Sequence, residues 1–176
     1  MPKITASALL IGLCLVPGLS AAHSFAGLVV FGDSLSDSGR AFVLSDGLYR
    51  PSPPYAQRFS NGPVAPEYLA SALGLPLLPA STPGGTNYAV GGATTDTRNV
   101  AWETDLPPGV KSIAALQHTG ITTQVGEFLS SGPPIDRANA LFMVWGGPND
   151  IVLAFLTGGD LADLAAAAGA AVGNLA

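Results

Sequence analysis

Cysteine, histidine and basic residues are scarce in this chain. Its 176 residues include one cysteine, two histidines and seven lysines or arginines, against twelve aspartates or glutamates, which gives a formal net charge of −5. The basic residues are scattered from Lys3 to Arg137, and scattered charges do not neutralise the closely spaced phosphates of a nucleic acid. No His, Cys, Asp or Glu cluster has the spacing of metal ligands. We therefore expect no nucleic-acid partner, no metal and no cofactor.

Apolar residues, glycine and proline are plentiful instead. The chain is 48% hydrophobic and 11% charged, with 22 glycines and 15 prolines. This composition is typical of a globular chain with many tight turns and argues against a disordered or coiled-coil protein. The length fits one domain with a substantial core.

The N-terminus has the pattern of a secretory signal. Lys3 is followed by the apolar run ITASALLIGLCLV and by small residues that end at Ala22. The run is shorter than the roughly 20 residues that a bilayer span needs. We predict a signal peptide at 1–22, a single folded domain at 23–176 and a secreted, periplasmic or cell-surface location. Cys14 lies within the signal, so the mature chain has no thiol chemistry.

Short apolar runs alternate with amphipathic or alanine-rich stretches, the pattern of an α/β layer fold. We predict strands at 27–31, 75–78, 86–92 and 140–147, and helices at 66–74, over 110–130 with a break at Gly120, and from Asp160 onward. The proline-rich loop 50–63 is predicted to form the wall of a site.

Ser34, Gly92 and Asn149 each lie at or just after the end of a predicted strand. Acyl transfer needs a hydroxyl nucleophile and at least two hydrogen-bond donors aimed at the oxyanion. Ser34 has the hydroxyl, Gly92 has no side chain to shield its N–H, and Asn149 has an amide that can donate. The carboxyl ends of parallel strands lie on one edge of a sheet, so we predict that the three residues converge.

Each of these residues also has a structural interpretation. Ser34 could cap the following helix, Gly91 and Gly92 could serve only a tight turn, and Asn149 with Asp150 is a common turn pair.

The other titratable residues near these positions are interpreted as structural. Asp33 and Asp37 fit turn or capping residues, and Asp150 has a structural role. His118 lies in a predicted helix, where most histidines are surface residues, and we do not expect it to act as a base.

Three motifs resemble one known family. FGDSLSDSG, GGTNYAVGGA and GGPND occur in the order of the first three blocks of the GDSL, or SGNH, esterase and lipase family. The resemblance implies a flavodoxin-like three-layer α/β/α sandwich with a parallel sheet of strand order 2-1-3-4-5. It also implies a hydrolase of small-molecule or lipid esters, with Ser34 as the nucleophile. The oxyanion-hole donors would be Ser34, Gly92 and Asn149.

The last motif of that family, Asp-x-x-His, is missing. His23 and His118 are preceded three positions earlier by Ser20 and Ala115, and no fifth strand is predicted. We expect an N-terminal portion of a longer enzyme with about four of five strands, inactive or nearly so without its His and Asp. Some members of that family carry an outer-membrane barrel in their C-terminal part. The sequence does not indicate whether this protein has one, nor does it indicate the oligomeric state.

A second hypothesis is a non-catalytic domain that keeps the ligand cleft of the fold. Such a domain would bind acyl or glycan esters without hydrolysing them, and the missing base is compatible with it. Neither the motifs nor the acidic charge indicates the length of the acyl chain.

Overall fold

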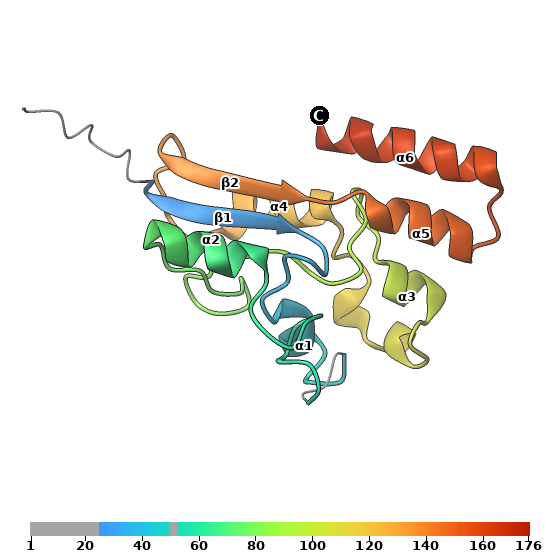
Figure 1. Cartoon of the computed structure of the whole chain (residues 1–176), viewed down its shortest axis with the longest axis horizontal. Coiled ribbons are helices and arrows are strands. Elements are labelled where there is room, and N and C mark those ends of the chain that lie inside the picture. Colours follow the sequence, from blue (N-terminus) through green and yellow to red (C-terminus); the bar gives the residue numbers. More distant parts are fainter. Residues whose placement is uncertain (1–24, 50–52) are drawn as a thin grey trace, which may run out of the picture.

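Two parallel strands form the sheet of the computed structural model, which describes residues 25–49 and 53–176 (Figure 1). They are β1 (Gly27–Gly32) and β2 (Ala140–Trp145), paired in register along their whole length. Every residue of β1 is buried, as its continuously apolar sequence predicts.

Six α-helices accompany the strands in the described residues. They are α1 (Arg40–Leu44), α2 (Ala65–Leu73), α3 (Val100–Thr104), α4 (Ile121–Ser131), α5 (Pro148–Leu156) and α6 (Leu161–Leu175). Two short 3₁₀ helices, Val110–Ser112 and Ala114–Leu116, precede α4. The predicted α/β class is confirmed.

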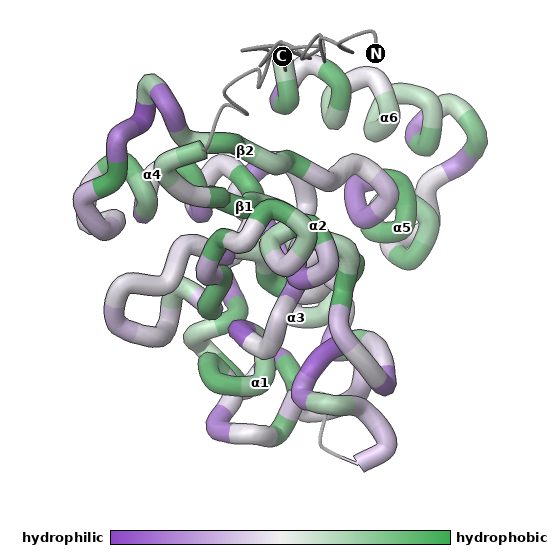
Figure 2. The backbone as a smooth tube through the Cα atoms, turned by 60° about the vertical axis from the view of Figure 1, so that its left-hand side comes forward, coloured by the Kyte–Doolittle hydropathy of each residue, from purple (hydrophilic) through white to green (hydrophobic). Residues whose placement is uncertain are grey.

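Helices cover both faces of β1. On one face Leu28 and Val30 pack against Ala70 of α2, and on the other Val29 packs in a cluster with Phe128 of α4. This division follows from the period of two in a strand, which sends successive side chains to opposite faces. Figure 2 shows both strands coloured as hydrophobic over most of their length.

The predicted strand at 86–92 is replaced by an irregular extended segment. It runs beside β1, where the Tyr88 N–H donates to the Val30 carbonyl at 2.7 Å and Asn87 forms an isolated parallel bridge with Val30. The segment ends in a turn at Gly91, which limits the ladder. The strand prediction is therefore wrong here, although the segment lies beside the sheet.

The predicted strand at 75–78 is also wrong. Pro79 forms one isolated bridge, to Asn87, and Pro76 and Pro79 have no N–H to donate to a ladder. Consequently β1 lies between the segment 86–90 and β2. In the predicted order 2-1-3-4-5, with strands numbered along the chain, 86–92 would instead lie between 27–31 and 140–147. The order predicted for these segments is therefore wrong.

The helix predictions are confirmed for α2 and α6 and wrong before Gly120. α2 ends at Gly74 in the left-handed conformation, with φ of 66°, and Asp160 caps α6 by accepting two N–H groups of its first turn. Residues 110–116 form the two 3₁₀ helices instead of an α-helix. α4 begins after Gly120, where a Cβ would overlap the Asp96 carbonyl.

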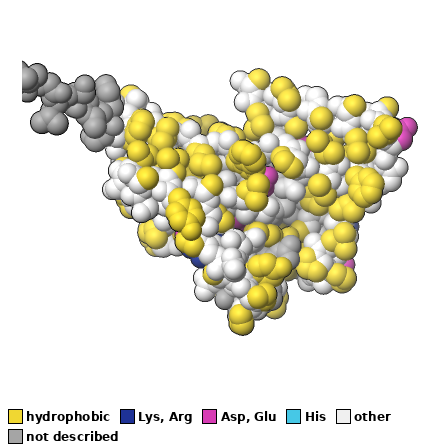
Figure 3. All heavy atoms as spheres, viewed as in Figure 1, with side chains coloured by type: hydrophobic (Ala, Val, Ile, Leu, Met, Phe, Trp, Pro, Cys, Tyr) yellow, Lys and Arg dark blue, Asp and Glu magenta, His cyan; other side chains and the backbone are white. Residues whose placement is uncertain are grey.

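Apolar side chains are exposed on β2 and on the last two helices. β2 pairs with β1 alone in the described sheet, and Phe142, Val144 and Trp145 are 41%, 50% and 47% exposed. Figure 3 shows hydrophobic side chains gathered over these elements. Of the helices that the structure describes, none combines the length and the apolar character that a membrane crossing requires. The predicted signal peptide, 1–22, lies outside the described residues.

Candidate active site

A tight turn places Ser34 at the carboxyl end of β1. The Asp33 carbonyl accepts the N–H groups of Ser36 and Asp37, both at 3.0 Å. The Asp33 carboxylate accepts the Leu35 N–H, also at 3.0 Å, so Asp33 is a turn residue as predicted. Burial raises the pKa of the Asp33 carboxyl. The turn leaves Ser34 half-buried between two pockets.

The buried Asp37 carboxylate joins this turn to the glycine pair of the second motif. It accepts the Gly91 N–H at 2.9 Å. At the start of α1 it accepts three further backbone N–H groups, those of Gly39, Arg40 and Ala41. Burial raises the pKa of the Asp37 carboxyl, and the N–H groups oppose that rise. Asp37 therefore caps α1, as predicted, and also aligns two motifs.

Asn87 holds the same turn from the side of the second motif. Its Nδ2 donates to the Ser36 carbonyl and to the Ser38 hydroxyl, both at 2.8 Å, and its Oδ1 accepts the Ala89 N–H at 3.1 Å. Sequence reasoning missed this residue. The available signal is a single amide inside an apolar run, because a buried amide needs hydrogen-bond partners.

The backbone at Gly92 requires glycine. Its φ is 86°, in the left-handed region, and a Cβ there would overlap the side chain of Asn99. Asn99 caps α3 and donates to the Gly91 carbonyl at 2.9 Å. A Cβ at Gly91 would overlap the Phe59 ring. The tight turn is therefore present, and within it the Gly92 N–H donates to no described residue.

Asn149 lies in the first turn of α5, directly after β2. Its Nδ2 donates to the Ala93 carbonyl at 2.9 Å, which orients the amide and leaves a second N–H available. The neighbouring Asp150 accepts the Thr95 N–H at 3.0 Å and the Thr95 hydroxyl at 2.7 Å, so its predicted structural role is confirmed. These bonds tie α5 to the loop after Gly92.

Ser34, Gly92 and Asn149 line one pocket of about 200 Å³. The rest of its wall consists of Tyr49, Phe59, Val100, Ala101 and Leu106. Three residues far apart in the sequence meet here because the segment 86–90 and β2 both run parallel to β1, so that their carboxyl ends share an edge.

His118 takes no part in this pocket. It is exposed and lines neither of the two pockets that contain Ser34. Because His23 lies outside the described residues, His118 is the one histidine that the structure describes. Within the described ranges, Ser34 therefore has no histidine in its pockets.

The family model described as GDSL-like Lipase/Acylhydrolase matches residues 28–175. The chain belongs to this family. A GDSL esterase/lipase from Arabidopsis thaliana is 38% identical to it over 90 residues, covering 41% of this chain and 23% of that protein. A phosphatidylcholine-sterol acyltransferase from Aeromonas hydrophila is 35% identical over 131 residues, covering 72% and 33%. The chain spans about a quarter to a third of the length of these relatives.

Gln124 of this GDSL-family chain supports the strand end that precedes Ser34. Its Oε1 accepts the Gly32 N–H at 2.8 Å, and its Nε2 donates to the carbonyls of Gly32 at 2.9 Å and Thr119 at 2.8 Å. The side chain is 1% exposed. Sequence reasoning missed Gln124, because helical spacing alone does not show that a polar residue faces the interior.

Gln124→Leu is expected to lower the free energy of unfolding by roughly 2 to 4 kcal/mol, because the buried Gly32 N–H and Thr119 carbonyl lose Gln124 as their partner. The Gly32 carbonyl keeps the Val90 N–H at 3.0 Å. Urea unfolding measures the loss. The matched control is Gln117→Leu at a partly exposed position, where we expect a change within about 0.5 kcal/mol. Equal losses in the two variants would contradict the role assigned to Gln124.

The proline-rich loop forms part of the wall of the site, as predicted. Phe59 lines both pockets at Ser34. Beside it, the Arg58 guanidinium donates to both carboxylate oxygens of Glu67 and so holds the loop against α2. Burial alone would raise the pKa of Glu67, but the bonds from Arg58 and from the Val64 N–H bring that pKa below its usual range.

Glu67→Gln is expected to lower the free energy of unfolding at neutral pH by roughly 1.5 to 3 kcal/mol, the range for hydrogen bonds to charged groups. The folded-state pKa of Glu67 lies below the unfolded one. Its stabilisation is therefore complete above the unfolded value of about 4.3 and is lost as the pH falls through the folded value. Urea unfolding from about pH 7 to pH 3 should show the difference between wild type and variant shrinking. A difference that stays constant over this range would contradict the assignment.

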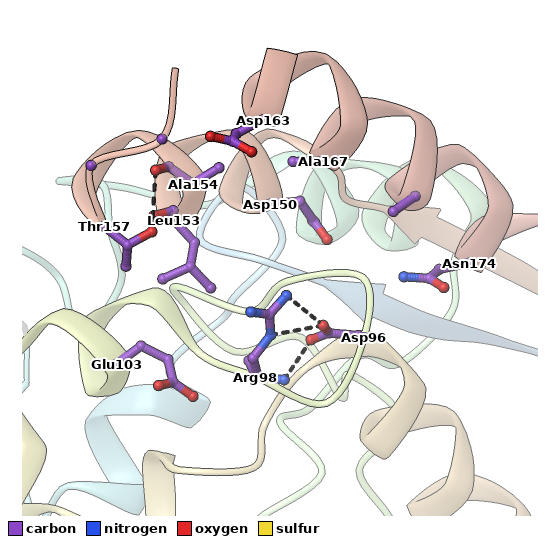
Figure 4. Close-up of a pocket in the computed structure, with 13 residues that line it drawn as sticks. Asp96, Arg98, Glu103, Asp150, Leu153, Ala154, Thr157, Asp163, Ala167 and Asn174 are labelled. Carbon is purple, nitrogen blue, oxygen red and sulfur yellow. Dashed lines mark hydrogen bonds and ion pairs between the residues drawn. The ribbon is translucent and has the colours of Figure 1, made fainter. Parts of the chain in front are cut away.

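A third pocket, of about 490 Å³, does not include Ser34. Figure 4 shows Asp150 of α5 and Asn174 of α6 around it, facing the pair formed by Asp96 and Arg98. Arg98 Nε donates to the Asp96 carboxylate at 2.8 Å. In the part of the chain that the structure describes, no three His, Cys, Asp or Glu side chains are grouped so that they could hold a metal ion. This pocket is a separate polar cleft.

Proposed function

We propose that this chain provides the nucleophile and the oxyanion hole of a serine hydrolase that acts on carboxylic esters. The observation that carries the proposal is the single pocket at which Ser34, Gly92 and Asn149 meet. The backbone N–H groups of Ser34 and Gly92 donate to no described residue, so both are available to a bound ester.

The reaction follows the general serine-hydrolase scheme. The Ser34 hydroxyl attacks the ester carbonyl and its proton passes to a histidine base. The new oxyanion accepts the N–H groups of Ser34, Gly92 and Asn149, each contributing on the order of 3 kcal/mol. The histidine returns the proton to the leaving alcohol, and a water molecule then releases the acid from acyl-Ser34.

The histidine base and its aspartate belong, in this proposal, to sequence outside the 176 residues. The chain spans a third or less of the two relatives described above, which is compatible with an additional segment. That segment would complete the flavodoxin-like sandwich, and residues 1–22 would direct export with cleavage near Ala22. Without the base, only residual catalysis by the oxyanion hole is expected from the 176-residue chain.

The test is hydrolysis of a short p-nitrophenyl ester by a protein extended through the codons downstream of residue 176. Turnover by the extended protein, with little turnover by the 176-residue chain, supports the proposal. A downstream sequence without Asp-x-x-His in any frame would overturn the assignment of the base.

One alternative is a non-catalytic domain that binds acyl or glycan esters. It is favoured by His118, the one described histidine, which is exposed and lines neither pocket at Ser34. Such a domain would bind an ester without hydrolysing it, even when the protein is expressed in its longest natural form. Turnover that depends on Ser34 would exclude it.

A further inference from the structure

Thr95 lies in a hydrogen-bond network between the loop after Gly92 and the last two helices. Its hydroxyl donates to Oδ1 of Asp150 in α5 at 2.7 Å, and the same hydroxyl oxygen accepts an N–H of Asn174 Nδ2 in α6 at 2.9 Å. Thr95 is fully buried, and Asp150 is 6% exposed. A hydroxyl has a single proton to donate, so the N–H group from Asn174 leaves that proton directed at Asp150.

This network lies beside the two segments that carry the proposed oxyanion donors. Asn149 precedes Asp150 in the first turn of α5 and donates to the Ala93 carbonyl of the loop. The Thr95 N–H donates in addition to Oδ2 of Asp150, at 3.0 Å. Two adjacent residues of α5 are therefore bonded to the same short stretch of loop, and a shift of one segment along the other would leave buried polar groups without partners.

We propose that Thr95 is a positioning residue for oxyanion stabilisation, acting through Asp150 on the amide of Asn149. The inference rests on the proposed function, because it uses Asn149 as an oxyanion donor. The Thr95 hydroxyl holds the Asp150 carboxylate, and this bond fixes the first turn of α5, from which the Asn149 amide reaches the pocket. A donor that is misplaced by a fraction of an ångström loses much of its effect on the rate.

Asn174 extends this positioning to α6, which lines neither pocket at Ser34. Its amide contributes one of the bonds that orient the Thr95 hydroxyl. The last helix of the chain is thereby linked to the Asn149 amide through Thr95 and Asp150. Its sequence should consequently affect the rate of the reaction without any contact with the substrate.

The main variant is Thr95→Val, which removes the hydroxyl and keeps the branched shape and the backbone N–H. Thr95→Ser restores a hydroxyl and tests rescue. Asn174→Ala, at an exposed position, tests the network even if Thr95→Val does not fold. The matched control is Thr104→Val in α3, where the lost hydroxyl donates to the Val100 carbonyl at 2.7 Å and Thr104 lines neither pocket at Ser34.

In the extended protein, Thr95→Val is expected to lower kcat for a p-nitrophenyl ester by about 10- to 100-fold with KM within about twofold, because a misplaced donor weakens mainly the transition state. Thr95→Ser should recover most of kcat. Asn174→Ala should lower kcat by about two- to tenfold, the effect of one hydrogen bond. Thr104→Val should leave both constants within about twofold.

A role through Asn149 is separated from a general structural role by a double-mutant cycle. In an Asn149→Ala background, Thr95→Val should lower kcat by less than about threefold, because the amide that it positions is gone. An equal loss in both backgrounds, or an equal loss with Thr104→Val, would overturn the proposal.

A second measurement needs no turnover. Solvent exchange of the Asn149 side-chain amide protons is followed by NMR in the extended protein with isotope-labelled asparagine, and Asn149→Ala assigns the signals. Thr95→Val should speed this exchange by about tenfold, because the bond to the Ala93 carbonyl opens more often. Unchanged exchange would overturn the proposal. Faster exchange without any Ser34-dependent turnover would leave the positioning of Asn149 assigned and remove only the hydrolase.

Discussion

Ester hydrolysis by the protein extended to its histidine base is expected to fall by about a million-fold in kcat when Ser34 is replaced by alanine. The alanine has no oxygen to form the acyl-enzyme, so only hydrolysis assisted by the oxyanion hole remains. The Ser34 N–H is a backbone group and persists in the variant. The KM for a p-nitrophenyl ester should therefore change far less than kcat, and initial rates at several substrate concentrations separate the two.

The matched control for this variant is Ser36→Ala. Ser36 belongs to the same turn, is 1% exposed and has a hydroxyl without a hydrogen-bond partner among the described residues. We expect its removal to change kcat by less than about tenfold, because removing an unpaired buried hydroxyl breaks no interaction. A loss as large as that of Ser34→Ala, or equal rates for wild type and Ser34→Ala, would rule out Ser34 as the sole nucleophile.

Asn149→Ala is expected to lower kcat by about 100- to 1,000-fold with a small change in KM. One N–H of the Asn149 amide is held by the Ala93 carbonyl at 2.9 Å, so the other is already oriented when an oxyanion forms. A donor positioned in advance stabilises the transition state more than the ground state, which is why kcat falls. The measurement is kcat and KM for the same ester in the extended protein.

Asn139→Ala is the control for Asn149→Ala. Asn139 is an exposed amide that donates to Asp136 at 2.7 Å, and its loss should leave both constants within about twofold. A higher KM with unchanged kcat for Asn149→Ala would indicate ground-state binding instead of oxyanion stabilisation.

The three proposed site residues could be selected from the sequence because their signals are local. Ser34 and Asn149 each follow a run of apolar residues that forms a strand. Gly92 lies near the end of a short motif, at a position where only glycine fits the backbone. The residues that hold them in place could not be selected in this way. Asp37 and Gln124 act on backbone groups 54 and 92 positions away, and nothing in their immediate neighbours indicates those partners.

The strand predictions show the same limit. The runs that form β1 and β2 can be recognised as strands from their apolar sequence. The runs 75–78 and 86–92 are also apolar, yet neither forms a regular strand. Whether an extended segment becomes a strand depends on ladder partners, and the prolines beside 75–78 remove donors that a ladder needs. Gly92 keeps its place although no regular strand precedes it, because the segment 86–90 still runs parallel to β1.

By itself, the sequence determined the α/β class, the family and the residues proposed for ester chemistry, since these depend on composition, periodicity and short motifs. The tertiary structure alone decided that Ser34, Gly92 and Asn149 line one pocket and that His118 lies outside it. The physical reason is that a pocket is formed by side chains from several segments. Their meeting depends on the register of β2 on β1 and on buried hydrogen bonds between distant residues.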